Sequence, residues 1–152
     1  LDLPLEYYRN KTLPGVSTWN DARFVRWKHD DVSFTQTTIE RMTEHFAAIR
    51  NSVPRIVAVT HHLPFEALLD RRHHVGWRFH DAFLGSPRLG DLLLSEPMVV
   101  LSVCGHNHHA KTVNVVHITA TSVGSTYSRK RCVFYDIDES GLRASEVHEV
   151  IA

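Results

Sequence analysis

The stretch Arg55-Ile56-Val57-Ala58-Val59-Thr60-His61-His62-Leu63-Pro64 places a pair of histidines and a proline after a short apolar run. The run is rich in β-branched residues and predicts a strand that is buried on both faces, as in parallel sheets. A second such run, Met98-Val99-Val100-Leu101-Ser102-Val103, leads into Cys104-Gly105-His106-Asn107-His108-His109. The sequence therefore predicts two buried strands that each end in histidines.

Helices are predicted around these two strands. Thr37 and Glu40 match a capping box, in which both side chains satisfy free amides of the first turn. The apolar residues that follow recur at helical spacing, which predicts a helix over about 36–51 that is ended by Pro54. Leucines predict a second, shorter helix near 87–95.

The rest of the chain divides into irregular segments and a run of strands. Residues 1–34 and 65–86 show no clear period, and we expect packed loops there. Helix–strand units followed by adjacent strands indicate an α/β fold, and the length favours a single domain over 1–152. Strands are predicted over 112–116, 117–123, 131–137 and 142–150, with a hairpin turn at 138–141.

The composition excludes several classes of protein. Lys plus Arg and Asp plus Glu each total 17, so no bulk charge attracts nucleic acid or a membrane surface. No stretch approaches the roughly 20 apolar residues of a membrane helix, and no signal peptide is visible, so we expect a cytoplasmic protein. Cys104 and Cys132 are expected to be two buried free thiols, with one disulfide between them as the alternative. Histidine is the outlier, with 12 in 152 residues, and it is the commonest metal ligand.

The two histidine groups are predicted to meet. Ligands of α/β sheets bind beyond the carboxyl ends of the strands, so His61-His62 and His106-Asn107-His108 share one crevice if their strands are neighbours. Gly105 lets the backbone turn sharply there. Three converging imidazoles would form a site for a zinc, iron or manganese ion. The alternative is that these histidines are exposed or hydrogen-bonded loop residues that bind no ligand.

In combination, Thr60-His61-His62-Leu63-Pro64 and Gly105-His106-Asn107-His108 resemble the last two metal motifs of the calcineurin-like metallophosphoesterases. In that family a histidine at a strand end, often before a proline, is followed by a Gly-His-x-His motif. The stretches 19–23 and 83–86 also look like segments of bacterial members. The resemblance extends from around residue 7 to the closing strands. It implies the C-terminal half of a four-layer α/β/β/α sandwich.

The resemblance also implies a dinuclear metal site. His61 and His106 would bind one ion and His108 the other, with His62 as the alternative to His61. Two divalent ions, of Mn, Fe or Zn, are expected in the complete domain. Together they would hydrolyse a phosphomonoester or phosphodiester, with the ions ~3.5–4 Å apart.

The carboxylate-rich half of such a site is missing from this sequence. Family members carry an earlier Asp-x-His, a Gly-Asp-x-x-Asp and a Gly-Asn-His-Asp/Glu, and none of these occurs here. Asn20-Asp21 and His80-Asp81 are not expected to replace them, because neither has the glycine context or follows a predicted strand. We therefore expect at most one well-bound ion and no activity from this chain alone. A missing N-terminal segment, which we favour, or a second chain would supply the carboxylates.

Three further expectations concern partners and alternatives. Half of a sandwich would leave an apolar sheet face exposed, which predicts a homodimer or a partner segment. Arg71, Arg72, His73 and His74 are candidates to bind the substrate phosphate, and the alternative is a solvated charge run. Besides a phosphoesterase, two functions stay open: an inactive truncated domain that binds a metal or a partner, and a mononuclear three-histidine hydrolase.

Overall fold

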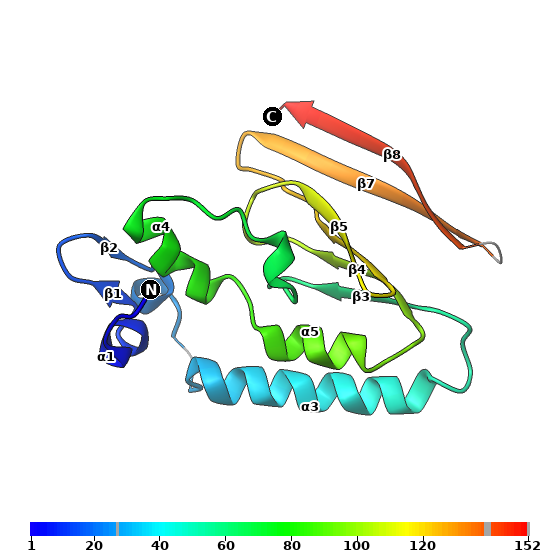
Figure 1. Ribbon diagram of the computed structural model, residues 1–152, viewed down its shortest axis with the longest axis horizontal. Helices are drawn as coiled ribbons and strands as arrows, with labels where there is room; N and C mark the ends of the chain where they lie inside the picture. Colours follow the sequence, from blue (N-terminus) through cyan, green and yellow to red (C-terminus); the bar gives the residue numbers. More distant parts are fainter. Residues whose placement is uncertain (27, 139–140, 152) are drawn as a thin grey trace.

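A four-stranded sheet forms the centre of the protein. The computed structural model describes residues 1–26, 28–138 and 141–151, and its architecture is mixed α/β, as predicted. Strands β3 (Ile56–Thr60), β4 (Val99–Cys104) and β6 (Ile118–Ser122) run parallel, and β5 (Lys111–Val115) pairs antiparallel with β6 (Figure 1). The order is β3-β4-β6-β5, so the two strands that lead into the histidines are neighbours.

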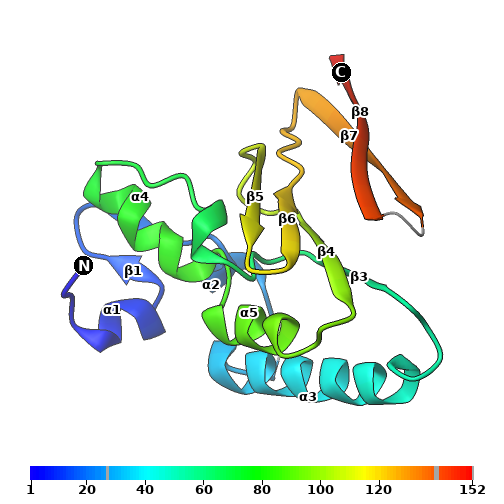
Figure 2. The ribbon, with the colours of Figure 1, turned by 45° about the vertical axis from the view of Figure 1, so that its right-hand side comes forward.

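Two helices cover one face of this sheet. Helices α3 (Asp31–Ile49) and α5 (Pro87–Leu94) lie side by side along it (Figures 1 and 2). Phe46 of α3 and Leu93 of α5 share one buried cluster with Ile118 of the sheet. Burial of side chains of this size contributes about 1.5–3 kcal/mol each. This helix–sheet layer is therefore the core that fixes where the strands end.

Helix α3 begins earlier than predicted. Its N-cap is Asp30, whose carboxylate accepts a hydrogen bond from the Ser33 N–H at 2.8 Å. Thr37, the predicted cap, lies inside the helix, where its hydroxyl donates to the Ser33 carbonyl at 3.0 Å. An aspartate caps at least as well as a threonine, and the earlier cap adds a turn of backbone hydrogen bonds. The prediction of Thr37 as the cap was therefore wrong.

A long hairpin forms a second, two-stranded sheet. Its strands, β7 (Arg129–Asp138) and β8 (Gly141–Ile151), contain the last two predicted strands. The predicted turn between them includes residues 139–140, which lie outside the described residues. The hydroxyls of Thr121 on β6 and Tyr135 on β7 form a hydrogen bond that connects the hairpin to the central sheet.

The segments expected to be loops contain several short elements. Aromatic contacts hold them together: Trp19 stacks on Phe83 with ring centroids 5.5 Å apart, and Tyr8 contacts Phe79 at 5.2 Å. Elements this short offer too few residues for a periodic pattern, so the sequence did not reveal them. They are α1 (Leu5–Arg9), β1 (Thr12–Leu13), β2 (Ser17–Thr18), α2 (Asp21–Phe24), the 3₁₀ helix η1 (Glu66–Leu68), α4 (Val75–His80) and the 3₁₀ helix η2 (Asp81–Phe83).

One face of β3 is open to solvent. Val57 and Val59 are 42% and 74% exposed, whereas Ile56 and Ala58 are buried against the helices. The prediction that β3 is buried on both faces was therefore wrong for this face. The exposed apolar residues of this sheet lie on its edge strand β3, whereas β4 and β6 are buried or half-buried. The structure shows one helix-covered sheet and a separate hairpin, and the four-layer arrangement stays a prediction.

Two smaller expectations concern the thiols and the membrane. Both cysteines are free thiols and Cys104 is buried, as predicted. Cys132 is exposed, so the prediction that both thiols are buried was wrong for Cys132. Within residues 1–26, 28–138 and 141–151, no helix combines the length and the apolar character that crossing a bilayer requires.

Candidate functional site

The two histidine segments meet at one rim of the central sheet. Parallel pairing of β3 with β4 sets Thr60 opposite Cys104, so both strands end at the same level. Just beyond them, the Gly105 N–H donates a hydrogen bond to the His61 carbonyl at 3.2 Å. His61, His62 and His106 line one cavity, whereas His108, which was predicted to share it, does not line it.

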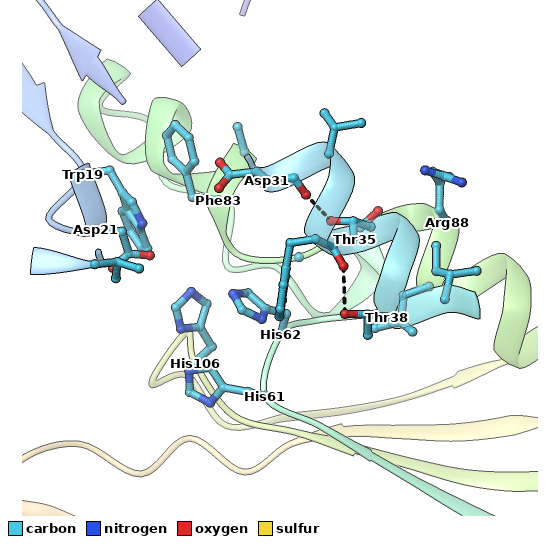
Figure 3. Close-up of a pocket in the computed structure, with 18 of the residues that line it drawn as sticks. Trp19, Asp21, Asp31, Thr35, Thr38, His61, His62, Phe83, Arg88 and His106 are labelled. Carbon is cyan, nitrogen blue, oxygen red and sulfur yellow. Dashed lines mark hydrogen bonds between the residues drawn. The ribbon is translucent and has the colours of Figure 1, made fainter. Parts of the chain in front are cut away.

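Three imidazole rings, those of His61, His62 and His106, form what we call the histidine cluster. The ring centroids lie 4.7 Å apart for His61 and His106, 4.7 Å for His62 and His106, and 5.3 Å for His61 and His62. Figure 3 shows the three rings grouped at the floor of a cavity. With metal–nitrogen bonds of about 2.0–2.1 Å, imidazoles on one tetrahedral ion have centroids about 5 Å apart. The spacing of the cluster therefore matches that of three rings around one ion.

The nitrogens of the three rings do not point toward one common position where a metal ion could bind. Among the described residues, no group of three or more His, Cys, Asp or Glu side chains is arranged to hold a metal ion. His106 does carry a buried Nε2 atom for which the described part of the chain offers no hydrogen-bond partner. Rotation about the side-chain torsions would be needed to direct three nitrogens to one point. The donor types and their spacing fit a metal ion, and their present orientation does not.

Burial and mutual repulsion keep two of the rings uncharged. Burial, followed by the neighbouring His62 and His61 rings, lowers the pKa of His106 from 6.5 to about 4. Burial and then His61 also lower the pKa of His62. The carboxylate of Asp21 partly opposes the shift at both rings. Neutral imidazole is the form that binds metal ions, so the environment favours the ligating state.

A hydrogen-bonded asparagine shapes the loop that carries His106. The backbones of His106 and His108 are left-handed, with φ of 69° and 54°, a region that non-glycine residues rarely adopt. Between them, the Asn107 amide donates to the Leu68 carbonyl at 3.1 Å, and its oxygen accepts from the Ser122 hydroxyl at 2.7 Å. These contacts hold the loop in its strained conformation, with His106 at the cluster.

His108 occupies a different place from the other predicted ligands. Its ring stands edge-on to Tyr127, with centroids 5.2 Å apart. In the described part of the chain it makes no ring contact with the histidine cluster. The structure thus brings His61 and His106 together with His62, the alternative ligand, and leaves His108 to one side. The assignment of ligands stays a prediction.

A cavity of about 530 Å³ opens over the histidine cluster. Small-molecule sites have volumes of this order. One wall comes from α3, and the opposite wall includes Trp19 and Phe83 (Figure 3). Trp19 stands edge-on to His106, with centroids 5.7 Å apart. The lining residues outside the cluster include Lys11, Trp19, Asp21, Val25, Asp31, Val32, Thr35, Thr38, Ile39, Phe83, Arg88 and Leu89.

The four residues predicted to bind phosphate lie outside this cavity. Arg71 and Arg72 form ion pairs with nearby carboxylates at 3.1 Å and 3.4 Å. His74 accepts a hydrogen bond from the Gly76 N–H at 3.1 Å and so caps α4. Neither these three residues nor His73 lines the cavity over the histidine cluster. Local contacts explain their positions, and a role in substrate binding stays a prediction.

Sequence reasoning missed the walls of the cavity. Asp31 and Thr35 belong to turns of α3 that precede the predicted start of this helix. Trp19 and Asp21 come from a segment that we expected to be a packed loop. Asp21 was dismissed as a replacement for the missing carboxylates because it follows no strand. The structure nevertheless places it in the same cavity as the histidine cluster (Figure 3).

Comparison of the chain with protein-family models, with curated proteins and with solved structures finds no match. The function is therefore inferred from the histidine cluster, the cavity and the two sequence motifs.

Proposed function

We propose that this chain carries the histidine-bearing part of a metal-dependent phosphoesterase, of the calcineurin-like type that its two motifs resemble. The observation that carries the proposal is the convergence of His61, His62 and His106 at the ends of two neighbouring parallel strands. The cluster lies at the floor of a cavity of ligand size. Burial keeps the imidazoles of His62 and His106 uncharged, and His106 has an unpartnered nitrogen among the described residues. Neutral imidazoles are suitable ligands for Mn, Fe or Zn.

The residues of the chain have distinct roles in this proposal. The histidine cluster would hold one ion, and His108 would bind the second ion once further ligands are present. When bound, the two divalent ions would polarise the phosphoester and activate a water molecule for attack on phosphorus. Lys11 and Arg88 line the cavity together with Asp21 and Asp31, so the described wall has no net formal charge. The aromatic wall formed by Trp19 and Phe83 would shield one side of a bound substrate from bulk water.

A dinuclear site also needs anionic ligands, which neutral histidines do not supply. We place their source on a further segment or a second chain that packs against the open face of β3. Val57 and Val59 are exposed on that face, and covering them would contribute apolar burial. Such a partner, or a second copy in a homodimer, would complete the four-layer sandwich of which this chain is the C-terminal half.

A mononuclear hydrolase is the second candidate function. The position of His62 favours it, because His61, His62 and His106 form a group of three at one place while His108 lies beside Tyr127. Three histidines with one open position are the ligand set of a mononuclear zinc hydrolase. The two candidates differ in the number of ions bound by the active protein.

Metal analysis tests the proposal. We expect the isolated chain to bind one Zn²⁺ or Mn²⁺ and the full-length protein two, with hydrolysis of 4-nitrophenyl phosphate by the latter. His106→Ala should abolish metal uptake and hydrolysis. The matched control is His45→Ala, because His45 is exposed on α3 and outside the cavity. Unchanged hydrolysis in His106→Ala would contradict a metal role for the cluster, and one ion in an active full-length protein would favour the mononuclear enzyme.

A further inference from the structure

We infer that the cavity selects a phosphate ester whose organic group is apolar, such as an aryl ester, over a nucleotide or another polyanion. This inference rests on the proposed function, because the histidine cluster would hold the phosphate end of the substrate. It is carried by two features of the cavity wall, its apolar surface and its balance of charge.

The apolar surface lies directly above the histidine cluster. Val25 and Val32 line the cavity and are 39% and 73% exposed, so they have no apolar cover of their own. Ile39 and Leu89 continue this surface toward the core, and the stacked pair of Trp19 and Phe83 faces it. The cavity of about 530 Å³ is larger than a phosphate group requires. An apolar organic group that fills the remaining space would remove these side chains from water, which favours binding.

The charge of the wall gives no advantage to a polyanion. Among the described residues, four charged ones line the cavity, the cations Lys11 and Arg88 and the carboxylates Asp21 and Asp31, so their formal charges cancel. Both cations already have partners. The Lys11 ammonium pairs with Asp31 at 2.8 Å, and the Arg88 guanidinium donates a hydrogen bond to the Gln36 side chain. The described part of this wall therefore offers a triphosphate no net positive charge, and an uncharged organic group meets no repulsion there.

Binding of two non-hydrolysable probes tests the inference in the metal-loaded chain. We expect 1-naphthylphosphonate to bind at least about tenfold more tightly than methylphosphonate by calorimetry, because the two share a headgroup and differ in apolar area. The double variant Val25→Thr/Val32→Thr keeps the shape of both side chains and adds hydroxyls. It should lower the ratio of the two affinities by about three- to tenfold.

The matched control is Val147→Thr/Val150→Thr, since Val147 and Val150 are 50% and 63% exposed on β8 and do not line the cavity. This control should leave the ratio unchanged. Equal affinity for the two phosphonates, or the same loss in both double variants, would overturn the inference.

Hydrolysis by the full-length protein separates this inference from the proposed function. We expect kcat/KM to be higher for 1-naphthyl phosphate than for glycerol phosphate or a nucleoside triphosphate. Hydrolysis of all three at equal efficiency would overturn the apolar preference and leave the phosphoesterase standing. Absence of hydrolysis together with a preserved preference for naphthylphosphonate would overturn the phosphoesterase and leave an apolar binding site.

Discussion

The hydroxyl of Ser122, at the end of β6, donates a hydrogen bond of 2.7 Å to the side-chain oxygen of Asn107 in the loop after β4. Ser122 is 1% exposed, so this bond is shielded from water. With the Leu68 carbonyl at 3.1 Å, it fixes Asn107 between two left-handed residues, His106 and His108. The position of the histidine cluster therefore depends on a contact between two different strand ends.

Removal of the Asn107 side chain should loosen this loop. Asn107→Ala leaves the Ser122 hydroxyl and the Leu68 carbonyl without their partners, so we expect a loss of about 1–3 kcal/mol in the free energy of unfolding. Metal affinity should fall by about 10–100-fold, as for other residues that position ligands. Urea denaturation and metal titration measure the two effects.

Asn107→Asp is the informative control, because it keeps the acceptor for Ser122 and loses the donor to Leu68. We expect it to retain more metal affinity than Asn107→Ala. If both variants bound metal as the unmodified chain does, Asn107 would not position His106.

His62 and His108 should differ in their effect on the first ion. His62 lies 4.7 Å from His106 between ring centroids, whereas the ring of His108 contacts Tyr127. We expect His62→Ala to weaken binding of the first ion by at least about 100-fold, since even residues that only position ligands contribute 10–100-fold. His108→Ala should change this affinity by less than about threefold. Isothermal titration with Zn²⁺ measures the affinity of each variant. A larger loss of affinity in His108→Ala than in His62→Ala would make His108 a ligand of the first ion.

The metal-free protein should lose stability in mild acid. The pKa of His106 is about 4 in the folded chain and near 6.5 when unfolded, so between these values the unfolded state binds more protons. The contribution of His106 to the free energy of unfolding is therefore fully present above pH 6.5 and declines as the pH falls toward 4. The lowered pKa of His62 acts in the same direction.

Urea unfolding measured near neutral pH and at about pH 5 tests this dependence. His106→Gln cannot gain the proton, so its loss of stability over that interval should be smaller than that of the unmodified chain. An identical loss in both proteins would mean that His106 is not the group responsible.

The two thiols should differ in reactivity. Burial raises the pKa of Cys104 to about 11, and Cys132 is exposed on β7. The thiolate is the reactive form, so iodoacetamide near pH 8 should modify Cys132 rapidly and Cys104 only after unfolding. Peptide mass spectrometry identifies the modified residue. Rapid labelling of Cys132→Ser in the folded state would show that Cys104 is more accessible than the structure indicates.

The sequence predicted the strand ends but not the directions of the side chains that follow them. The apolar runs before His61 and Cys104 are local features, and they predicted β3 and β4 within one residue at each end. The position of His108 beside Tyr127 depends on the backbone torsions around Asn107, whose side chain is hydrogen-bonded to Ser122, a residue 15 positions away. Contacts at such separations leave no periodic signal.

The sequence did not predict the residues of the cavity walls, for a related reason. Trp19 lies in a segment that was predicted to be a packed loop, and its contact with Phe83 agrees with packing, yet the same ring stands edge-on to His106. Asp31 was placed in a loop because the capping pattern of Thr37 and Glu40 predicted a later start, whereas the helix begins after the Asp30 cap. The positions of Trp19 and Asp31 at the site therefore depend on contacts between segments that are distant in the sequence, which the sequence alone does not reveal.

X-ray absorption at the metal edge tests the central claim most directly. In the chain loaded with one equivalent of Zn²⁺, we expect scattering from three imidazoles, those of His61, His62 and His106. The number should fall to two in His62→Ala and stay at three in His108→Ala. A zinc ion with no imidazole shell, or one whose shell is unchanged when His106 is replaced by alanine, would contradict the account.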